Sequence, residues 1–121
     1  MELHREADAP NHITAAGDGW VKVSGERHQL PVMVEPEAIT PLPAGAGEQL
    51  DIASPALRQA AERKPAVLLL GMPGGGTPPV RLIGQFNAAG VGLEAMDIAA
   101  ACRTFNVLAA EGRHVVAVLL D

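Results

Sequence analysis

Residues 67–90 read VLLLGMPGGGTPPVRLIGQFNAAG, and this stretch decides the fold. Its first four residues are apolar without alternation, which is typical of a strand that is covered on both faces. A glycine-rich segment, Gly71 to Thr77, follows. Pro78 to Ala89 then has the pattern of a helix, and Gly90 is placed to end it in the left-handed conformation. A buried strand, a loop and a helix in this order indicate a layered α/β fold.

The rest of the chain towards the C-terminus repeats this pattern. Val91 to Ala95 predicts the next short strand, and Asp97 is a good N-cap for a helix to about Glu111, which Gly112 ends. Val115 to Leu120 is a second continuous apolar run. Since it has no polar alternate position, we expect it to be a central strand like Ala66 to Leu70.

The first third of the chain predicts strands of a different kind. Trp20 to Val23 and Leu30 to Val34 alternate apolar residues with others, and turn dipeptides stand at 18–19 and 24–25. This pattern is typical of a small antiparallel meander. Because proline cannot donate a ladder hydrogen bond, Pro31 predicts that the third strand lies at an edge.

A region rich in proline and glycine separates the two halves. We expect Glu35 to Ala53 to be a long surface loop, because no regular element tolerates so many breakers. Ser54 is then expected to cap a short helix with Pro55 at its first position, running to about Lys64. The order of three strands followed by three helix–strand pairs predicts a mostly parallel central sheet, with the leading strands as an extra layer or edge.

Composition limits the classes of partner. The 121 residues include 9 Lys+Arg and 14 Asp+Glu, a formal charge of -5, with two Phe, one Trp and no Tyr. We therefore expect no nucleic-acid partner, because the chain offers little positive charge and few rings for stacking. The longest apolar run is too short to span a bilayer, and Met1 to His12 is charged, so we expect no membrane insertion. The single Cys102 allows no internal disulfide, and a cytoplasmic location is expected.

The glycine-rich segment has two interpretations. It lies between a buried strand and a helix, where phosphate loops occur, but it has neither the Gly-Lys-Ser/Thr ending nor the dinucleotide spacing. Pro78 and Pro79 also have no N–H group with which to hold an anion. A tight structural loop is the preferred interpretation. If the loop binds a ligand, Gly74 and Gly75 are the candidate contacts.

The helix predicted after Asp97 has an apolar face and a polar stripe. Cys102 falls on the apolar face, so we expect it to pack as a small hydrophobic residue rather than react. Arg103 and Asn106 share another stripe, with Thr104 on its flank. Since Asn is a poor residue inside a helix, its amide is expected to have a partner. That partner is either backbone in an adjacent loop, such as the glycine-rich one, or a ligand.

No other residues form a recognisable catalytic or metal-binding motif. The four histidines lack metal-ligand spacing, and Ser24 and Ser54 occupy turn and cap positions. Glu94 and Asp97 are close enough for a carboxylate pair, although strand polarity and helix capping explain both. We therefore assign no catalytic residue, no metal site and no cofactor from the sequence.

Three segments carry a resemblance to a known family: residues 90–97 (GVGLEAMD), 101–108 (ACRTFNVL) and 111–113 (EGR). With these segments the chain resembles domain-of-unknown-function family 498/598, the MTH-like domain, from about Ile13 to Leu119. The resemblance implies a three-layer α/β fold with a mixed central sheet, helices and a small N-terminal antiparallel β layer. We expect one domain of this kind at 13–121, after a flexible N-terminus at 1–12. Many members have Gly-Thr-Gly where this chain has Gly-Met-Pro at 71–73, so the loop departs from the family.

The resemblance supplies no catalytic residues. The family includes a mitochondrial assembly factor of respiratory complex I and an animal protein linked to adipogenesis, and its bacterial members are largely uncharacterised. We therefore expect a non-catalytic protein-interaction or assembly module with an unidentified protein partner, as a monomer or homodimer. The alternative is a small-molecule-binding protein or an enzyme. Its cleft would lie between the glycine-rich loop and the stripe of Arg103, Thr104 and Asn106.

Overall fold

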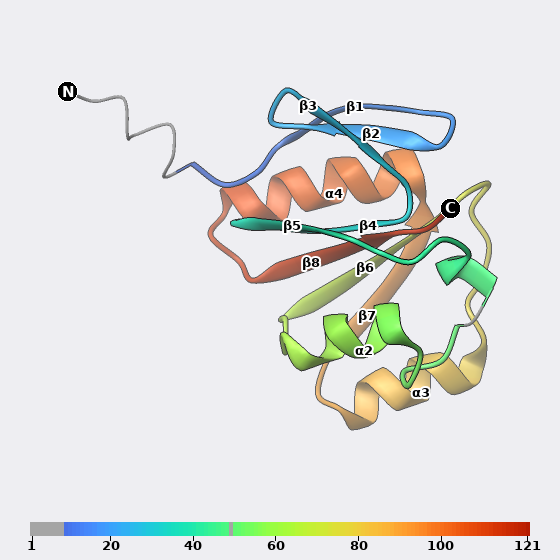
Figure 1. Ribbon diagram of the computed structural model, residues 1–121. Coiled ribbons are helices and arrows are strands. Elements are labelled where there is room, and N and C mark those ends of the chain that lie inside the picture. Colours follow the sequence, from blue (N-terminus) through green and yellow to red (C-terminus); the bar gives the residue numbers. More distant parts are fainter. Residues whose placement is uncertain (1–8, 49) are drawn as a thin grey trace.

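The computed structural model describes residues 9–48 and 50–121 (Figure 1). Its elements follow one another in the order β1 (Ile13–Gly17), β2 (Trp20–Val23), β3 (Glu26–Gln29), β4 (Val32–Glu35), β5 (Ala38–Pro41), η1 (Ala46–Glu48), α2 (Pro55–Glu62), β6 (Val67–Met72), α3 (Val80–Ala88), β7 (Gly92–Asp97), α4 (Ile98–Ala110) and β8 (Val115–Leu119).

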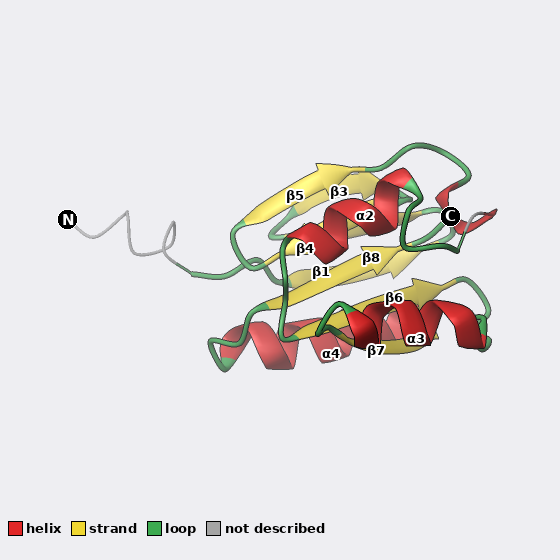
Figure 2. Cartoon of the chain, turned by 90° about the horizontal axis from the view of Figure 1, so that it is seen from below, coloured by secondary structure: helices red, strands yellow, loops and turns green. Residues whose placement is uncertain are grey.

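The strands form two sheets that stack with the helices into three layers. The smaller sheet has the order β1-β2-β3, and the larger has the order β5-β4-β8-β6-β7. In the larger sheet β6 runs parallel to β7 and β8, whereas β4 is antiparallel to both β5 and β8. Helices α2 and α3 cover one face, and α4 with the smaller sheet covers the other (Figures 1 and 2). The predicted three-layer fold with a mixed central sheet is confirmed.

The two apolar runs form the centre of the core, as predicted. Leu68 and Leu70 of β6 pack on the α2 and α3 side, while Leu69 packs on the α4 side. Every residue of β8 is buried, because its side chains alternate between the same two layers. Ala66 precedes the strand and is exposed, so the buried part of this segment begins later than expected. A strand with two covered faces needs apolar residues at every position, which is why these runs do not alternate.

The N-terminal meander forms, but its third strand is not the expected one. Residues 18–19 connect β1 to β2, and residues 24–25 connect β2 to β3. The third strand is β3, whose residues Glu26–Gln29 are polar or exposed and gave no apolar alternation. Of the two faces of this small sheet, only the one turned towards α4 and the core is covered by other residues. Val21 and Val23 point inward from β2 into the core beside α4.

The prediction that the strand at 30–34 belongs to this meander and lies at an edge is wrong. Strand β4 begins after Pro31 and lies inside the larger sheet, between β5 and β8. Because Pro31 stands outside the strand, its missing N–H group removes no ladder bond, and its carbonyl accepts a hydrogen bond from Leu42 N (3.1 Å). The chain therefore crosses from one sheet to the other at this proline.

The prediction of one long loop at 35–53 is also wrong in part. Residues 38–41 form β5, which pairs antiparallel with β4 through a tight turn that brings Glu35 opposite Ala38. A short 3-10 helix follows at 46–48. Strand β5 can hold Pro41 because it is the edge of the sheet, where one side of the strand forms no ladder.

Several boundaries of the other elements differ from the predictions. Helix α2 ends at Glu62, α3 begins only after Pro79, and β7 extends to Asp97. The Ser54 side chain does not cap α2, because its hydroxyl donates instead to the carbonyl of Asp51 (2.7 Å). The predicted Asp97 cap is confirmed: its Oδ1 accepts from Ala100 N (2.8 Å).

The described helices include none long and apolar enough to cross a membrane. Of the N-terminus predicted to be flexible, residues 1–8 lie outside the described part of the chain. Asn11 lies within it and contacts the turn between β4 and β5: its Nδ2 donates to Glu35 O (2.9 Å), and its backbone N–H donates to Pro36 O (2.7 Å).

Candidate functional site

The glycine-rich loop lies where the connections of two parallel strands leave the sheet in opposite directions. After β6 the chain passes to α3 on one face, and after β7 it passes directly into α4 on the other. The last residues of the two strands, Met72 and Asp97, are register partners. In open α/β sheets such a switch point is a common place for ligands. Its position alone makes the loop a candidate, so its donors decide what it can hold.

The loop uses its own polar groups to hold its shape. Gly74, Gly75 and Gly76 all have positive φ angles, a conformation that side chains rarely adopt. The N–H group of Gly75 donates to Met72 O (2.8 Å) and is not free for an anion. A Cβ at Gly75 would lie 3.9 Å from that of Asp97, the residue that caps α4, so the loop packs closely on the start of this helix. These contacts fit the tight structural loop and disfavour a phosphate.

Asn106 binds backbone, in a strand rather than in the glycine-rich loop. Its Nδ2 donates to Ile13 O (2.9 Å), and its Oδ1 accepts from Ile13 N (2.8 Å). The amide therefore occupies both peptide groups that Ile13 directs away from β2, as a neighbouring strand would. The expectation that the amide has a partner is confirmed, and the partner is the edge of β1.

The other two polar residues predicted on this helix differ in exposure. Arg103 is exposed, while Thr104 is half-buried and its hydroxyl lies 3.6 Å from the sulfur of Met96 in β7. Arg103 shares its side of the helix with Val107, whose side chain is 57% exposed. We call the exposed positions on this side the α4 stripe; they are Ala99, Arg103, Val107 and Ala110.

The structure does not bring all predicted site residues together. Gly75 lies beside Asp97 at the start of α4, whereas Asn106 lies nine residues further on, about 14 Å along a helix. Two cavities lie elsewhere in the fold, and neither is lined by a residue of the glycine-rich loop or by Arg103, Thr104 or Asn106. The five candidate residues therefore lie in different settings. Gly74 and Gly75 are in the loop, Arg103 is exposed on α4 and Thr104 is half-buried, while Asn106 is bonded to the backbone of β1.

Cys102 packs as predicted. Its side chain is buried in the core beside Phe105 and Ala101. Burial raises the pKa of the Cys102 thiol to about 11, and the neighbouring positive charge of Arg103 lowers it only in part. A thiol with such a pKa is protonated at neutral pH and is a poor nucleophile.

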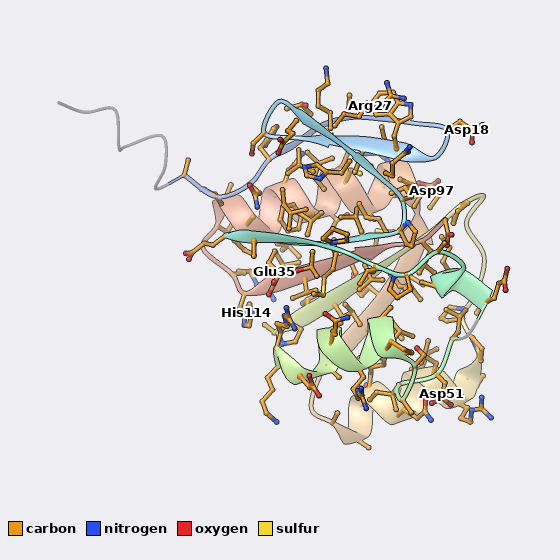
Figure 3. All side chains as sticks on the ribbon, in the orientation of Figure 1. Asp18, Arg27, Glu35, Asp51, Asp97 and His114 are labelled. Carbon is orange, nitrogen blue, oxygen red and sulfur yellow. The ribbon has the colours of Figure 1, made fainter. Side chains whose placement is uncertain are left out.

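A cavity of about 510 Å³ lies at the end of the molecule where the β4–β5 turn meets the connection from α4 to β8. Figure 3 shows Glu35 and His114, two of its lining residues, at this end. The Glu35 carboxylate pairs with Arg63 (Nε to Oε1, 3.3 Å). A second cavity of about 220 Å³ lies between the 43–48 segment and the start of α2. The larger cavity was not predicted, because segments distant in sequence build its walls.

Among the described residues no charged or polar side chain is fully buried, and no group of three His, Cys, Asp or Glu side chains is arranged to hold a metal ion. Asp97 is occupied as a helix cap, which is the structural explanation expected for it. His114 is exposed, and His28 is half-buried with its Nε2 3.5 Å from Glu26 Oε1.

Comparisons with known proteins agree with this architecture. A family model described as a protein of unknown function (DUF498/DUF598) matches residues 13–120. A search of curated proteins found no match.

Solved bacterial structures are similar over nearly the whole chain. The crystal structure of a Bordetella parapertussis protein is 38% identical with a TM-score of 0.82, covering 94% of this chain and 98% of that one. An NMR structure from Bordetella pertussis, described as a Mth938-like domain, is 31% identical with a TM-score of 0.75, covering 91% and 85%. An NMR structure from Xanthomonas campestris is 32% identical with a TM-score of 0.73, covering 99% and 92%.

Proposed function

The chain belongs to the DUF498/DUF598 family of proteins of unknown function, and on that premise we propose that it is a non-catalytic protein-interaction module. The proposed contact surface is the α4 stripe, with Arg103 and Val107 at its centre. Thr104 flanks this surface, whereas Asn106 and the glycine pair Gly74 and Gly75 serve the fold.

The exposure of Val107 is the observation that carries this proposal. A helix that packs on a sheet turns its apolar residues inward, and α4 does so with Cys102 and Phe105. Val107 is on the opposite side and remains 57% exposed, one turn from the exposed Arg103. An exposed apolar side chain next to an arginine is a common feature of protein interfaces, where arginines often contribute strongly to affinity.

Affinity purification from the native host tests the proposal. The tagged parent and the variant Val107→Asp are purified in parallel, and co-purifying proteins and small molecules are identified together. The proposal predicts a protein that the parent retains and Val107→Asp loses. Val80→Asp is the matched control, because Val80 is 83% exposed on α3, on the other face of the sheet. The proposal would be contradicted if the parent, Val107→Asp and Val80→Asp retained the same proteins in equal amounts. It would also be contradicted if only a small molecule co-purified.

The resemblance to a family that includes a respiratory-complex assembly factor supports a narrower proposal about the partner. We propose that it is a component or assembly protein of a respiratory complex. We also propose a cytoplasmic site of action, which the free buried thiol of Cys102 supports, because structural cysteines in oxidising compartments are usually paired. Cell fractionation with detection of the tagged chain tests the location.

A further inference from the structure

The outer face of the small sheet carries two cations in register. Lys22 of β2 and Arg27 of β3 are direct register partners, and both are exposed. Their side chains point away from the core, because the neighbouring Val21 and Val23 point into it. Figure 3 shows Arg27 on the side of the sheet away from α4. The register assigns this outer face Ala15, Gly17, Trp20, Lys22, Arg27 and Gln29, none of them acidic.

This pairing opposes stability. Like charges directly opposite each other on neighbouring strands repel, and a sheet is normally stabilised by opposite charges or apolar pairs at such positions. Neither Lys22 nor Arg27 has an ion pair with a carboxylate in the part of the chain that the structure describes. The whole chain has a formal charge of -5, so a positive face is contrary to its overall balance. No carboxylate of the described residues therefore offsets the repulsion between Lys22 and Arg27.

The side chain of Trp20 is held in place on the same face. The guanidinium carbon of Arg27 lies 4.2 Å from the centroid of the indole ring, in cation–π contact. The opposite strand supplies Gly17, where any Cβ would overlap the indole. The ring is therefore fixed between a glycine and an arginine. Aromatic and arginine side chains that are already ordered lose little freedom on binding, which favours them as interface anchors.

We propose that this outer face, with Trp20, Lys22 and Arg27 as its contacts, binds an acidic segment of a partner polypeptide. Carboxylates of the partner would neutralise the paired cations, and an aliphatic part of its chain would lie on the indole. This inference rests on the proposed function, since it gives the chemistry of one partner segment and adds a second contact surface to the α4 stripe.

The same face is a poor fit for nucleic acid. Binding of a single strand needs several stacking rings and a track of cations. Trp20 is the one Trp of the chain, Tyr is missing from the sequence, and both phenylalanines, Phe86 and Phe105, are fully buried. Two cations on a protein of net negative charge match a few carboxylates better than a continuous phosphate backbone.

Trp20 allows binding to be measured at the site itself, because the intrinsic tryptophan fluorescence of the protein comes from this residue alone. The full chain is titrated with a capped peptide of alternating glutamate and alanine, which contains no fluorophore. We expect a saturable change in Trp20 fluorescence. The same peptide with glutamine in place of glutamate should give no saturable change. Raising the ionic strength from about 0.01 M to about 1 M should abolish binding, because the screening length falls from about 30 Å to about 3 Å.

Charge-matched variants assign the binding to this face. Lys22→Gln/Arg27→Gln should raise the Kd at least about tenfold, the effect expected when interface anchors are removed. Arg58→Gln/Lys64→Gln removes the same charge from exposed positions in and after α2, on the other side of the central sheet, and should leave the Kd unchanged. Lys22→Gln alone should raise the Tm, because it relieves the repulsion from Arg27. A lowered Tm would show that the cations serve the fold and would overturn the inference.

Three further results would overturn it: no saturable binding of the glutamate peptide, equal affinity for the glutamine peptide, or tighter binding of an oligothymidylate, which would assign the face to nucleic acid. These outcomes are separable from failure of the proposed function. If the glutamate peptide does not bind but Val107→Asp still loses a partner that the parent retains, only this inference fails. If no protein depends on Val107, the proposed surface on α4 fails whatever the titration shows.

Discussion

The amide of Asn106 and the backbone of Ile13, 93 residues apart in the chain, are joined by two hydrogen bonds of 2.8 and 2.9 Å. Removing the amide leaves the N–H and carbonyl of Ile13 without partners, which costs about 1–3 kcal/mol. The better helix propensity of alanine offsets only several tenths of a kcal/mol. We therefore expect Asn106→Ala to lower the denaturant midpoint of unfolding.

The control for this change is Arg103→Ala on the exposed side of the same helix. It should alter the free energy of unfolding by less than about 0.5 kcal/mol, as surface substitutions usually do. A midpoint for Asn106→Ala that is unchanged or raised would remove the structural role of the amide. Asn106 would then become the first candidate for a ligand contact.

Replacing glycine by alanine should have opposite effects on stability at two positions, Gly71 and Gly84. A Cβ at Gly71 of β6 would lie 2.8 Å from Leu119 Cδ2 and 3.2 Å from Ala101 Cβ, so Gly71→Ala overpacks the contact between the sheet and α4. We expect a loss of about 1–3 kcal/mol. Gly84, exposed in α3, has nothing within 4 Å of an added Cβ. Gly84→Ala should stabilise by about 0.5–1 kcal/mol, which is the difference in helix propensity.

Chemical denaturation of both variants measures these effects. The account of the α4 packing fails if Gly71→Ala is as stable as the parent. Since the two substitutions add the same methyl group, a loss at Gly71 beside a gain at Gly84 shows that the added methyl is harmful only where the structure is crowded.

Cys102 predicts a pH dependence of stability at the alkaline end. Burial raises the pKa of the folded thiol from 9.0 to about 11, so between these values the unfolded chain releases a proton that the folded chain retains. The free energy of unfolding should therefore fall as the pH rises from about 9 to about 11. Cys102→Ala should show a smaller fall over the same range. Identical slopes for the two proteins, or rapid labelling of the native thiol at neutral pH, would refute the assignment.

The central strands predict the pattern of amide exchange. β8 lies between β4 and β6, and every one of its residues is buried. The amide hydrogens of β8 and β6 should exchange only through global unfolding. Those of residues 42–48 and 50–53, which lie outside both sheets, should exchange faster. Hydrogen exchange followed by NMR measures both. Equal rates in the strands and in this segment would contradict the layered core.

Local sequence patterns predicted the elements whose cause is local. The continuous apolar runs predicted the central strands β6 and β8, and the Asp97 cap and the apolar face of α4 follow from helix geometry. The place of β4 depends instead on pairing with β8, where Val32 lies opposite Leu119, and no local pattern encodes a partner so distant. The edge strand β5 was not predicted, because prolines usually indicate a loop, whereas a strand at the edge of a sheet tolerates them.

For the candidate site too, the sequence predicted the local features but not the partners that depend on the tertiary fold. A helical asparagine beside an apolar face indicated a bound amide, but the identity of Ile13 as its partner depends on the packing of the small sheet against α4. The sequence could have predicted that Lys22 and Arg27 are register partners, because residues 24–25 form the tight turn between their strands. The structure adds that Glu26, the carboxylate of these strands, lies opposite Val23 and so belongs to the other face of the sheet.

The most direct test of the account is site-specific photo-crosslinking in the native host, with a photoreactive residue in place of Val107. Because Val107 is the exposed apolar residue at the centre of the proposed surface, a discrete crosslinked protein should form there. The same photoreactive residue at Arg58, exposed on α2, should give no such product. A crosslink at position 107 that is absent at position 58 is the predicted result. No product at position 107, or the same products at both positions, would contradict the interaction module.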